Sequence, residues 1–342
     1  MTVAHGGLDE RELRALGVDP GAVLDLSANL HPDGPSPAVL AAARSARLDR
    51  YAPPDAAPLR AAIAVHEGVP GAWVLPTPGA TAALHLVARA FLRPGDRAAV
   101  LQPAFGEYEA AVRAAGAEVI PAATDAPDFA PPATLPAAAL AFAANPNNPT
   151  GAYASMNKVE RWLSPSRTLV LDAAYEAFVR SSWDAVDLVR AGANAIVVRS
   201  MTKLHAVPGV RLGYVVAAPQ VIARLEPLLP SWSLDAVAQA AGPVALAEHP
   251  ARVALLEETW LVRERLRAAL RAAGFAVGPA QANFLLVEVG DAAEARGALL
   301  RDGILGRDCA SFGLPGWLRV AVPRASDEQH VREALLRLRR GR

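Results

Sequence analysis

Apolar runs alternate with segments of helical periodicity through the middle of the chain. The runs that predict buried strands lie at 97–102, 118–120, 139–143, 168–172, 195–198 and 214–217. Amphipathic spacing between them predicts helices, for example at 106–115 and 156–163. Nearly continuous apolar strands that alternate with helices are typical of a mainly parallel sheet covered on both faces. We therefore expect ligand-binding side chains at the carboxyl ends of these strands.

The pattern differs at the two ends of the chain. Before the alternating region, spacing and turn residues predict helices at 8–16, 37–45, 59–67 and 82–91, and a short strand at 23–29. After Pro219, a long helix at 236–270 is interrupted near His249-Pro250. It is followed by expected strands at 284–289 and 317–322 and helices at 292–300 and 327–339. This second rhythm predicts a smaller α/β unit.

Composition excludes several classes of function. The 342 residues carry 34 basic and 34 acidic side chains, so no charge excess favours a polyanionic partner such as nucleic acid. The single cysteine, Cys309, excludes an internal disulfide framework and a cysteine-based zinc site. The chain has neither an apolar stretch of about 20 residues nor a signal-peptide pattern at its start. We expect a soluble cytoplasmic protein with no membrane or nucleic-acid partner and no metal.

Lysine is rare in this chain, which directs attention to the stretch 200–214. Only Lys158 and Lys203 are lysines, and the other basic residues are arginines. A desolvated lysine can lose its proton and attack a carbonyl group, which arginine cannot do. Ser200, Thr202 and Arg211 lie close to Lys203 in the sequence and suit an anionic group such as a phosphate. A surface lysine beside a loop is the alternative interpretation of this stretch.

Three motifs in order resemble one family. Residues 145–151 read Asn-Pro-Asn-Asn-Pro-Thr-Gly, residues 172–175 read Asp-Ala-Ala-Tyr, and residues 200–214 contain the lysine stretch. This sequence of motifs is similar to that of the pyridoxal-phosphate (PLP) enzymes of fold type I, in the class I and II aminotransferase group. The resemblance covers nearly the whole chain. One of these motifs alone is weak evidence, whereas three with family-like spacing are strong.

The resemblance implies a fold and a division of the chain. A large PLP-binding domain at 46–225 is expected to hold a mainly parallel seven-stranded sheet between helices. A smaller α/β domain is expected at 226–342, and residues 1–45 form an N-terminal arm that packs with it.

Each motif residue then has an implied role toward the cofactor. Lys203 holds PLP as a Schiff base and moves protons. Asp172 pairs with the pyridine nitrogen, and a helix N-cap is its structural alternative. Asn148 and Tyr175 hydrogen-bond the phenolic oxygen. Phe105 stacks on the ring, with Tyr108 as the other candidate and core packing as the alternative for both.

The implied phosphate contacts come from several segments. They are the hydroxyl groups of Ser200 and Thr202, the guanidinium of Arg211, and the backbone at Gly79, Ala80 and Thr81, where a helix begins. Tyr51 is expected to reach the phosphate of a neighbouring subunit. The resemblance therefore implies a homodimer with shared active sites.

Further residues are implied to bind the substrate. Arg319 matches the family arginine that binds the substrate α-carboxylate through a fork of two hydrogen bonds. His5, Asn29 and Arg307 are expected to line a second anion pocket, so the substrate is a phosphorylated amino acid or amine. A disordered terminal residue is the alternative for His5, and an exposed strand residue is the alternative for Arg319.

Shorter motifs favour one branch of the family. The segments 5–7, 26–32, 231–233 and 306–313 are similar to those of threonine-phosphate decarboxylases of cobalamin biosynthesis, although His31 stands where asparagine is expected. We therefore expect decarboxylation of O-phospho-L-threonine to (R)-1-aminopropan-2-yl phosphate. Histidinol-phosphate aminotransferase, with 2-oxoglutarate, is the alternative. A PLP-fold protein that only binds ligands is a more remote one, because every expected cofactor contact is present.

Overall fold

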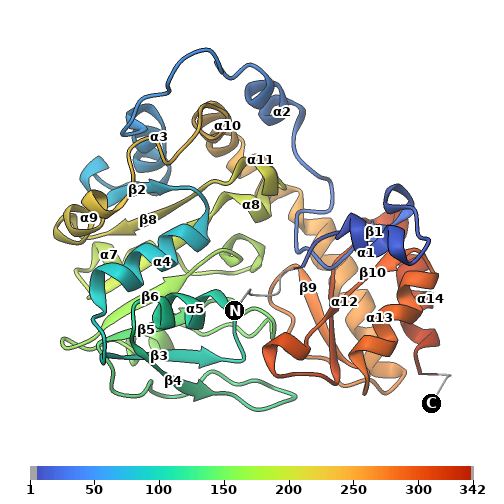
Figure 1. The fold of residues 1–342 in the computed structure, drawn as a ribbon. Helices are drawn as coiled ribbons and strands as arrows, with labels where there is room; N and C mark the ends of the chain where they lie inside the picture. Colours follow the sequence, from blue (N-terminus) through green and yellow to red (C-terminus); the bar gives the residue numbers. More distant parts are fainter. Residues whose placement is uncertain (1–5, 340–342) are drawn as a thin grey trace.

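Seven strands form the central sheet of the computed structural model, which describes residues 6–339 (Figure 1). Their order across the sheet is β2 (Val74–Thr77), β8 (Gly213–Ala217), β7 (Ala195–Ser200), β6 (Thr168–Asp172), β5 (Leu140–Ala144), β3 (Arg97–Gln102) and β4 (Glu118–Ala123). Strand β8 runs antiparallel to both of its neighbours, and the other neighbouring pairs are parallel. The expected mainly parallel seven-stranded sheet is confirmed.

Both edge strands of this sheet contain a proline, Pro76 in β2 and Pro121 in β4. Proline has no N–H group to donate to a neighbouring strand, so it belongs at an edge and discourages pairing with another chain. Pro76 also explains why the sequence gave no strand signal for β2. The apolar run there is short and is interrupted by Pro76.

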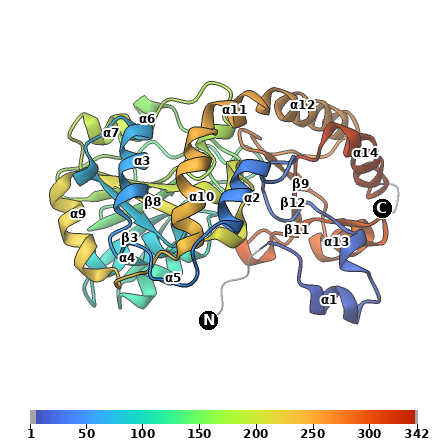
Figure 2. The same cartoon turned by 90° about the horizontal axis from the view of Figure 1, so that it is seen from above.

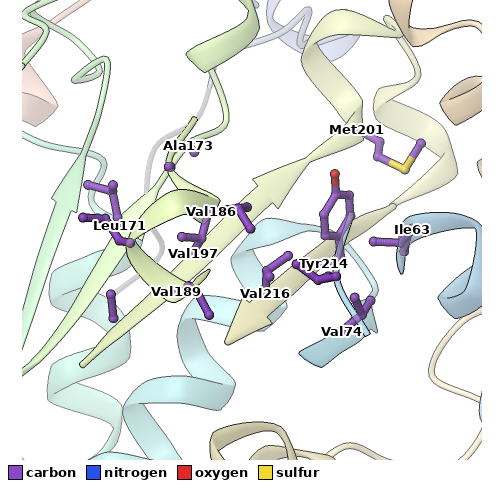
Figure 3. Packing of buried hydrophobic residues seen from close by; sticks show 14 of the residues in the cluster. Ile63, Val74, Leu171, Ala173, Val186, Val189, Val197, Met201, Tyr214 and Val216 are labelled. Carbon is purple, nitrogen blue, oxygen red and sulfur yellow. The ribbon is translucent and has the colours of Figure 1, made fainter. Parts of the chain in front are cut away.

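Side chains alternate between the two faces of the sheet and form two cores. On one face, Leu171, Val197 and Val216 pack with α3 (Ala57–Glu67), α6 (Met156–Glu160), α7 (Val186–Arg190) and α10 (Ala236–Ala247). Figure 3 shows Tyr214 beside Ile63 of α3 in this core, with Val216 farther along the same strand. On the other face, Val170, Val198 and Val215 pack with α4 (Ala80–Phe91), α5 (Glu107–Ala114) and α9 (Pro219–Leu225).

A second unit follows the large sheet in the chain. It contains a three-stranded antiparallel sheet in the order β11 (Arg307–Asp308), β12 (Trp317–Ala321) and β9 (Phe284–Glu288). A third core joins this sheet to α12 (Leu256–Ala272), α13 (Ala292–Arg301) and α14 (Glu328–Arg337). These elements lie to one side of the large sheet in Figure 1.

The start of the chain lies against this smaller unit. Strand β1 (Leu24–Asp25) pairs in parallel with β10 (Ile304–Leu305). Leu13 of α1 (Glu10–Ala15) is fully buried against Leu300 and Leu305. The chain then returns to the large sheet through α2 (Pro37–Arg44), which lies alongside α10 (Figure 2).

Helix α10 packs with the large sheet, which affects where the boundary between the two domains is placed. Ala238, Ala241 and Ala245 belong to the core of the large sheet, although they follow the expected boundary at residue 225. The next helices are α11 (His249–Ala254) and α12, and α12 belongs to the smaller unit. We therefore propose a boundary near residue 255 in place of the division at 225, with residues 1–45 as an arm.

The remaining elements are short connections. They are α8 (Met201–Leu204) and the 3₁₀ turns η1 (Pro20–Ala22), η2 (Gly71–Trp73), η3 (Glu176–Phe178), η4 (Pro208–Val210), η5 (Glu226–Leu228), η6 (Ala310–Phe312) and η7 (Ala325–Asp327). The helix expected at 236–270 consists of three pieces, α10, α11 and α12. No helix among the described residues is both long and apolar enough to cross a membrane.

Candidate active site

A cavity of about 610 Å³ lies at the carboxyl ends of β5, β6 and β7, and residues of the smaller unit and of the N-terminal segment also line it. This is where a mainly parallel α/β sheet binds its ligands. Of the residues that the sequence nominated, the cavity brings together Asn29, Ala80, Thr81, Phe105, Tyr108, Asn148, Asp172, Tyr175, Ser200, Thr202, Lys203, Arg211 and Arg319.

Four nominated residues are not part of the cavity wall. Gly79 is buried directly behind it, at the start of α4. Tyr51 is 83% exposed, with its ring centroid 5.1 Å from that of Trp232. Arg307 is half-buried beside the cavity and donates to Ser311 Oγ at 2.8 Å. His5 lies outside the described residues.

Asp172 ends β6 with its carboxyl group buried in the cavity wall. Its Oδ1 accepts from the Ala174 N–H at 3.0 Å, and its Oδ2 accepts from the Tyr108 hydroxyl at 2.9 Å. Burial raises the pKa of this carboxyl group, whereas these hydrogen bonds and the charge of Lys203 oppose the rise. A buried carboxylate of this kind suits a cationic N–H partner such as a pyridinium ring.

Lys203 lies on the short helix α8, directly after β7. Its Nζ is 5.8 Å from the ring centroid of Tyr175, inside the cavity. The Lys203 carbonyl accepts from the His31 N–H at 2.9 Å. The next carbonyl, that of Leu204, accepts from Arg252, which is buried and also binds the Gly34 carbonyl. The backbone that carries the amine is therefore tied to two distant segments.

Asn148 and Tyr175 are held so that each keeps a donor available. The Oδ1 of Asn148 accepts from Arg319 Nη1, which leaves the amide Nδ2 as its donor. The Tyr175 hydroxyl accepts from Asn29 Nδ2 at 3.2 Å, which leaves its own proton to be donated. Two donors in one wall suit an anionic oxygen such as the phenolate of PLP.

The start of α4 forms a cradle for an anion. No side chain caps its first N–H groups within the described part of the chain, and Ala80 and Thr81 line the cavity. Unpaired N–H groups and the helix dipole favour an anion at such an end. A Cβ atom on Gly79 would lie 2.8 Å from Arg211 Nη2, so the guanidinium approaches this helix start closely. With Ser200 and Thr202 alongside, these groups fit the phosphate of PLP.

Arg319 lies on β12 and forms part of the cavity wall. It is 4% exposed and donates from Nη2 to the Ser27 carbonyl at 2.7 Å, while its Nε–H has no acceptor among the described residues. Arg307 stands opposite it in the β11–β12 register, and both guanidinium groups lie within 6 Å of the Phe312 ring. Burial, followed by the charge of Arg319, lowers the pKa of Arg307. This concentration of positive charge favours an anionic ligand.

Comparison with known proteins assigns the chain to a family. The model of the aminotransferase class I and II family matches residues 22–338. The chain belongs to this family. It is an enzyme, and pyridoxal 5'-phosphate is its cofactor. The family is therefore the one that the three sequence motifs indicated.

Similar proteins of known name come from two branches of this family. A histidinol-phosphate aminotransferase of Symbiobacterium thermophilum is 36% identical over 92% of this chain and 90% of its own. One of Ralstonia nicotianae is 33% identical over 90% of this chain and 87% of its own. The structure of L-threonine-O-3-phosphate decarboxylase from Porphyromonas gingivalis has a TM-score of 0.82 at 27% identity, over 92% of this chain and 99% of its own. Both branches that the sequence suggested are represented.

Several residues of the site gave no usable signal in the sequence. Tyr108 was considered only for stacking, and its hydrogen bond to Asp172 joins residues that are 64 positions apart. Arg252 is one of many arginines, and its burial against α8 depends on the path of α11. Among the described residues, no group of three histidine, cysteine, aspartate or glutamate side chains has an arrangement that could hold a metal ion.

Proposed function

We propose that this enzyme is an aminotransferase that acts on a phosphorylated amine, histidinol phosphate, with 2-oxoglutarate as the amino acceptor. The curated relatives that are 32–36% identical to it bear the name histidinol-phosphate aminotransferase. The observation that carries the proposal in this chain is the position of Arg319 in the cavity wall. Its guanidinium is buried, and its Nε has no hydrogen bond within the described residues, so it is a ready anion-binding group.

One cation can serve both halves of a transamination. The two substrates occupy the same cavity in turn, so Arg319 meets the phosphate of the amine in one half-reaction and a carboxylate of the acceptor in the other. A guanidinium suits both anions, because each presents two oxygens to its fork of donors. The cofactor phosphate is held separately, by the start of α4 with Arg211.

The residues of this chain divide the remaining tasks. When bound, PLP supplies an electron-accepting ring for the substrate carbanion. Lys203 Nζ would hold the cofactor through its carbonyl carbon. Once the substrate amine has displaced it, the freed amine of Lys203 would accept the proton from the substrate α-carbon. Asp172 keeps the ring nitrogen protonated. Asn148 Nδ2 and the Tyr175 hydroxyl donate to the phenolic oxygen.

Decarboxylation of O-phospho-L-threonine is the second candidate. The bond of the α-carbon that stands perpendicular to the ring is the one that breaks, so a carboxylate in that position leaves as carbon dioxide. The decarboxylase structure of P. gingivalis favours this reaction, as does the presence of Gly6, Asn29 and Phe312 in the cavity wall. The sequence motifs favoured it too, but the names of the relatives support the aminotransferase better.

One assay separates the two reactions. The PLP-loaded enzyme is mixed with histidinol phosphate and 2-oxoglutarate, and in a second tube with O-phospho-L-threonine. Glutamate in the first tube supports the aminotransferase, and carbon dioxide with aminopropanol phosphate in the second establishes the decarboxylase instead. Lys203→Ala must abolish whichever activity the unchanged enzyme shows. The proposal is contradicted if Lys203→Ala still forms both products, or if the unchanged enzyme forms neither.

The assembly is part of the proposal. We propose a homodimer in which Tyr51, exposed here beside Trp232, reaches the cofactor phosphate of the second subunit. An exposed tyrosine can donate a hydrogen bond across an interface that also buries its ring. Arg307 is proposed to approach the substrate anion from β11. His5, which lies outside the described residues, stays a candidate ligand of the same anion.

A further inference from the structure

Tyr108 is 1% exposed and forms part of the cavity wall. Its ring is stacked on that of Phe142, with the centroids 5.7 Å apart and the planes at 13°. The ring of Phe105 meets it edge-on at 5.8 Å and is itself only partly buried. Of the two aromatic candidates in the cavity wall, Phe105 is the more exposed and the better placed to face the cofactor ring, since Phe142 covers one face of Tyr108.

The hydroxyl group of Tyr108 points to the catalytic carboxylate. It donates to Asp172 Oδ2 at 2.9 Å, and the Ala174 N–H donates to Oδ1 at 3.0 Å. We propose that Tyr108 is a positioning residue, which fixes the orientation of the Asp172 carboxylate and keeps it ionised so that it can hold the cofactor's ring nitrogen in its protonated form. The inference rests on the proposed pairing of Asp172 with that nitrogen.

The hydrogen-bonding capacity of the carboxylate leaves room for both partners. A carboxylate has about four lone-pair positions, and Tyr108 and Ala174 use two of them. The carboxylate of Asp172 can therefore accept from a pyridinium N–H without releasing Tyr108. Two fixed donors also prevent it from rotating about its last bond, so its free lone pairs keep one direction.

The electrostatic setting makes the bond from Tyr108 important. Burial disfavours the charged form of Asp172, and a donated hydrogen bond favours it. Tyr108 remains a donor throughout, because burial, followed by the charge of Asp172, raises the pKa of its phenol well above the ordinary value. Without this bond the carboxylate gains affinity for a proton, and a neutral Asp172 stabilises a pyridinium ring poorly.

The chain offers a matched control in Tyr214. That residue is also buried, at 3% exposure, and its hydroxyl donates to a buried carboxylate, Glu67 Oε1, at 2.5 Å. Tyr214 is not part of the cavity wall. Replacement of either tyrosine by phenylalanine removes the same atom from the same type of bond, but only Tyr108→Phe removes it from Asp172.

The decisive measurement follows the protonation of the ring nitrogen. Enzyme loaded with PLP labelled with ¹⁵N in the ring is titrated with acid and base, and the ¹⁵N chemical shift reports the protonated fraction. In Tyr108→Phe we expect the proton affinity of the nitrogen to fall about tenfold, PLP to dissociate more readily by a similar factor, and kcat to fall with KM little changed. Tyr214→Phe must leave the ¹⁵N titration unchanged.

The outcomes distinguish this inference from the proposed site. If Asp172→Asn retains the protonated-ring signal, the assignment of Asp172 to the nitrogen is wrong. If Asp172→Asn loses it but Tyr108→Phe titrates like the unchanged enzyme, only the role of Tyr108 is overturned. Should Tyr108→Phe not fold, 3-fluorotyrosine at position 108 replaces it, and its ¹⁹F resonance must shift when PLP binds. An unmoved resonance overturns the inference as well.

Discussion

Arg319 is held by acceptors from two segments that are far apart in the sequence. Its guanidinium donates to the Ser27 carbonyl and to Asn148 Oδ1, so it joins the N-terminal segment, the loop after β5 and strand β12. In the proposed function, the substrate anion binds to the same group. Arg319 would then couple substrate binding to the orientation of the Asn148 amide, which is expected to contact the cofactor.

Replacement of Arg319 by lysine tests this coupling. Lysine keeps the charge but not the planar fork, so we expect kcat/KM to fall by between about tenfold and a hundredfold, mostly through KM for the anionic substrate. The affinity for PLP should also fall, since Asn148 loses its partner. Steady-state kinetics and cofactor titration measure the two effects.

The control for that change is Arg296→Lys. Arg296 has a similar fork, which holds both carboxylate oxygens of Glu12 at 2.8 and 2.7 Å, outside the cavity wall. Its replacement should leave both measurements unchanged. If kcat/KM and PLP affinity fell equally in the two variants, the effect would follow from replacing any arginine that makes two such hydrogen bonds. Arg319 would then have no special place in the site.

At the scale of elements, the start of α4 is shaped by two glycines. Gly79 has φ +86°, a left-handed conformation that side chains resist, and a Cβ atom there would meet Arg211. A Cβ atom on Gly213 of β8 would lie 2.6 Å from the Ala80 nitrogen. Close approach of β8 to α4 therefore requires glycine at position 213, and close approach of the Arg211 guanidinium to the helix start requires glycine at position 79.

Gly79→Ala is expected to damage this anion cradle. The substitution places a methyl group against Arg211 in a backbone conformation unfavourable to alanine, so stability should fall by about 1 kcal/mol or more. The dissociation constant of PLP should rise by about tenfold or more. Thermal unfolding and fluorescence titration with PLP measure these changes.

Gly297→Ala provides the opposite control. Gly297 lies inside α13, where a Cβ atom would meet nothing within 4 Å. Alanine should therefore stabilise the protein by roughly 0.5–1 kcal/mol through its higher helix propensity and leave PLP binding unchanged. If Gly79→Ala left stability and PLP binding as little impaired as Gly297→Ala does, the close approach of Arg211 to the start of α4 would be unimportant.

At the scale of the whole molecule, three buried or half-buried histidines lie in the segments around α8. His31 belongs to the N-terminal segment, His205 follows α8, and His249 begins α11. Burial is the main cause that lowers the pKa of His31 to about 4, of His205 to about 3 and of His249 to about 4. The neighbouring charges of Arg252 and Arg199 act in the same direction, whereas Asp33 opposes them at His31.

These shifts predict that acid destabilises the fold. The unfolded chain takes up protons at these histidines near pH 6.5, well above the pH at which the folded protein does. The free energy of unfolding is therefore greatest above about pH 6.5 and falls as the pH drops from there towards 4. We expect a loss of at least ~2 kcal/mol between pH 7 and pH 5, measured by urea unfolding.

Substitutions identify the source of this pH dependence. His31→Gln removes one buried titrating group and should flatten the slope of the unfolding free energy between pH 7 and pH 5. His330→Gln, at an exposed position of α14, should not. A slope that is the same in both variants would mean that His31 contributes nothing to the acid sensitivity.

The sequence by itself determined the family, most of the elements and most of the site. Continuous apolar runs predicted six of the seven large-sheet strands, because strands buried on both faces must be apolar along their length. Three motifs nominated Asn148, Asp172, Tyr175 and Lys203, because chemically constrained residues next to turns leave a local pattern. The cavity brings all four together.

Only the tertiary structure decided what depends on the approach of distant segments. Three such features leave no local pattern in the sequence. They are the hydrogen bond from Tyr108 to Asp172, the hydrogen bonds of His31 and Arg252 to α8, and the packing of α10 in the core of the large sheet. Contacts of this kind depend on how helices and loops cross in space. The position of Arg307 beside the cavity, with its guanidinium bonded to Ser311, is likewise set by the fold.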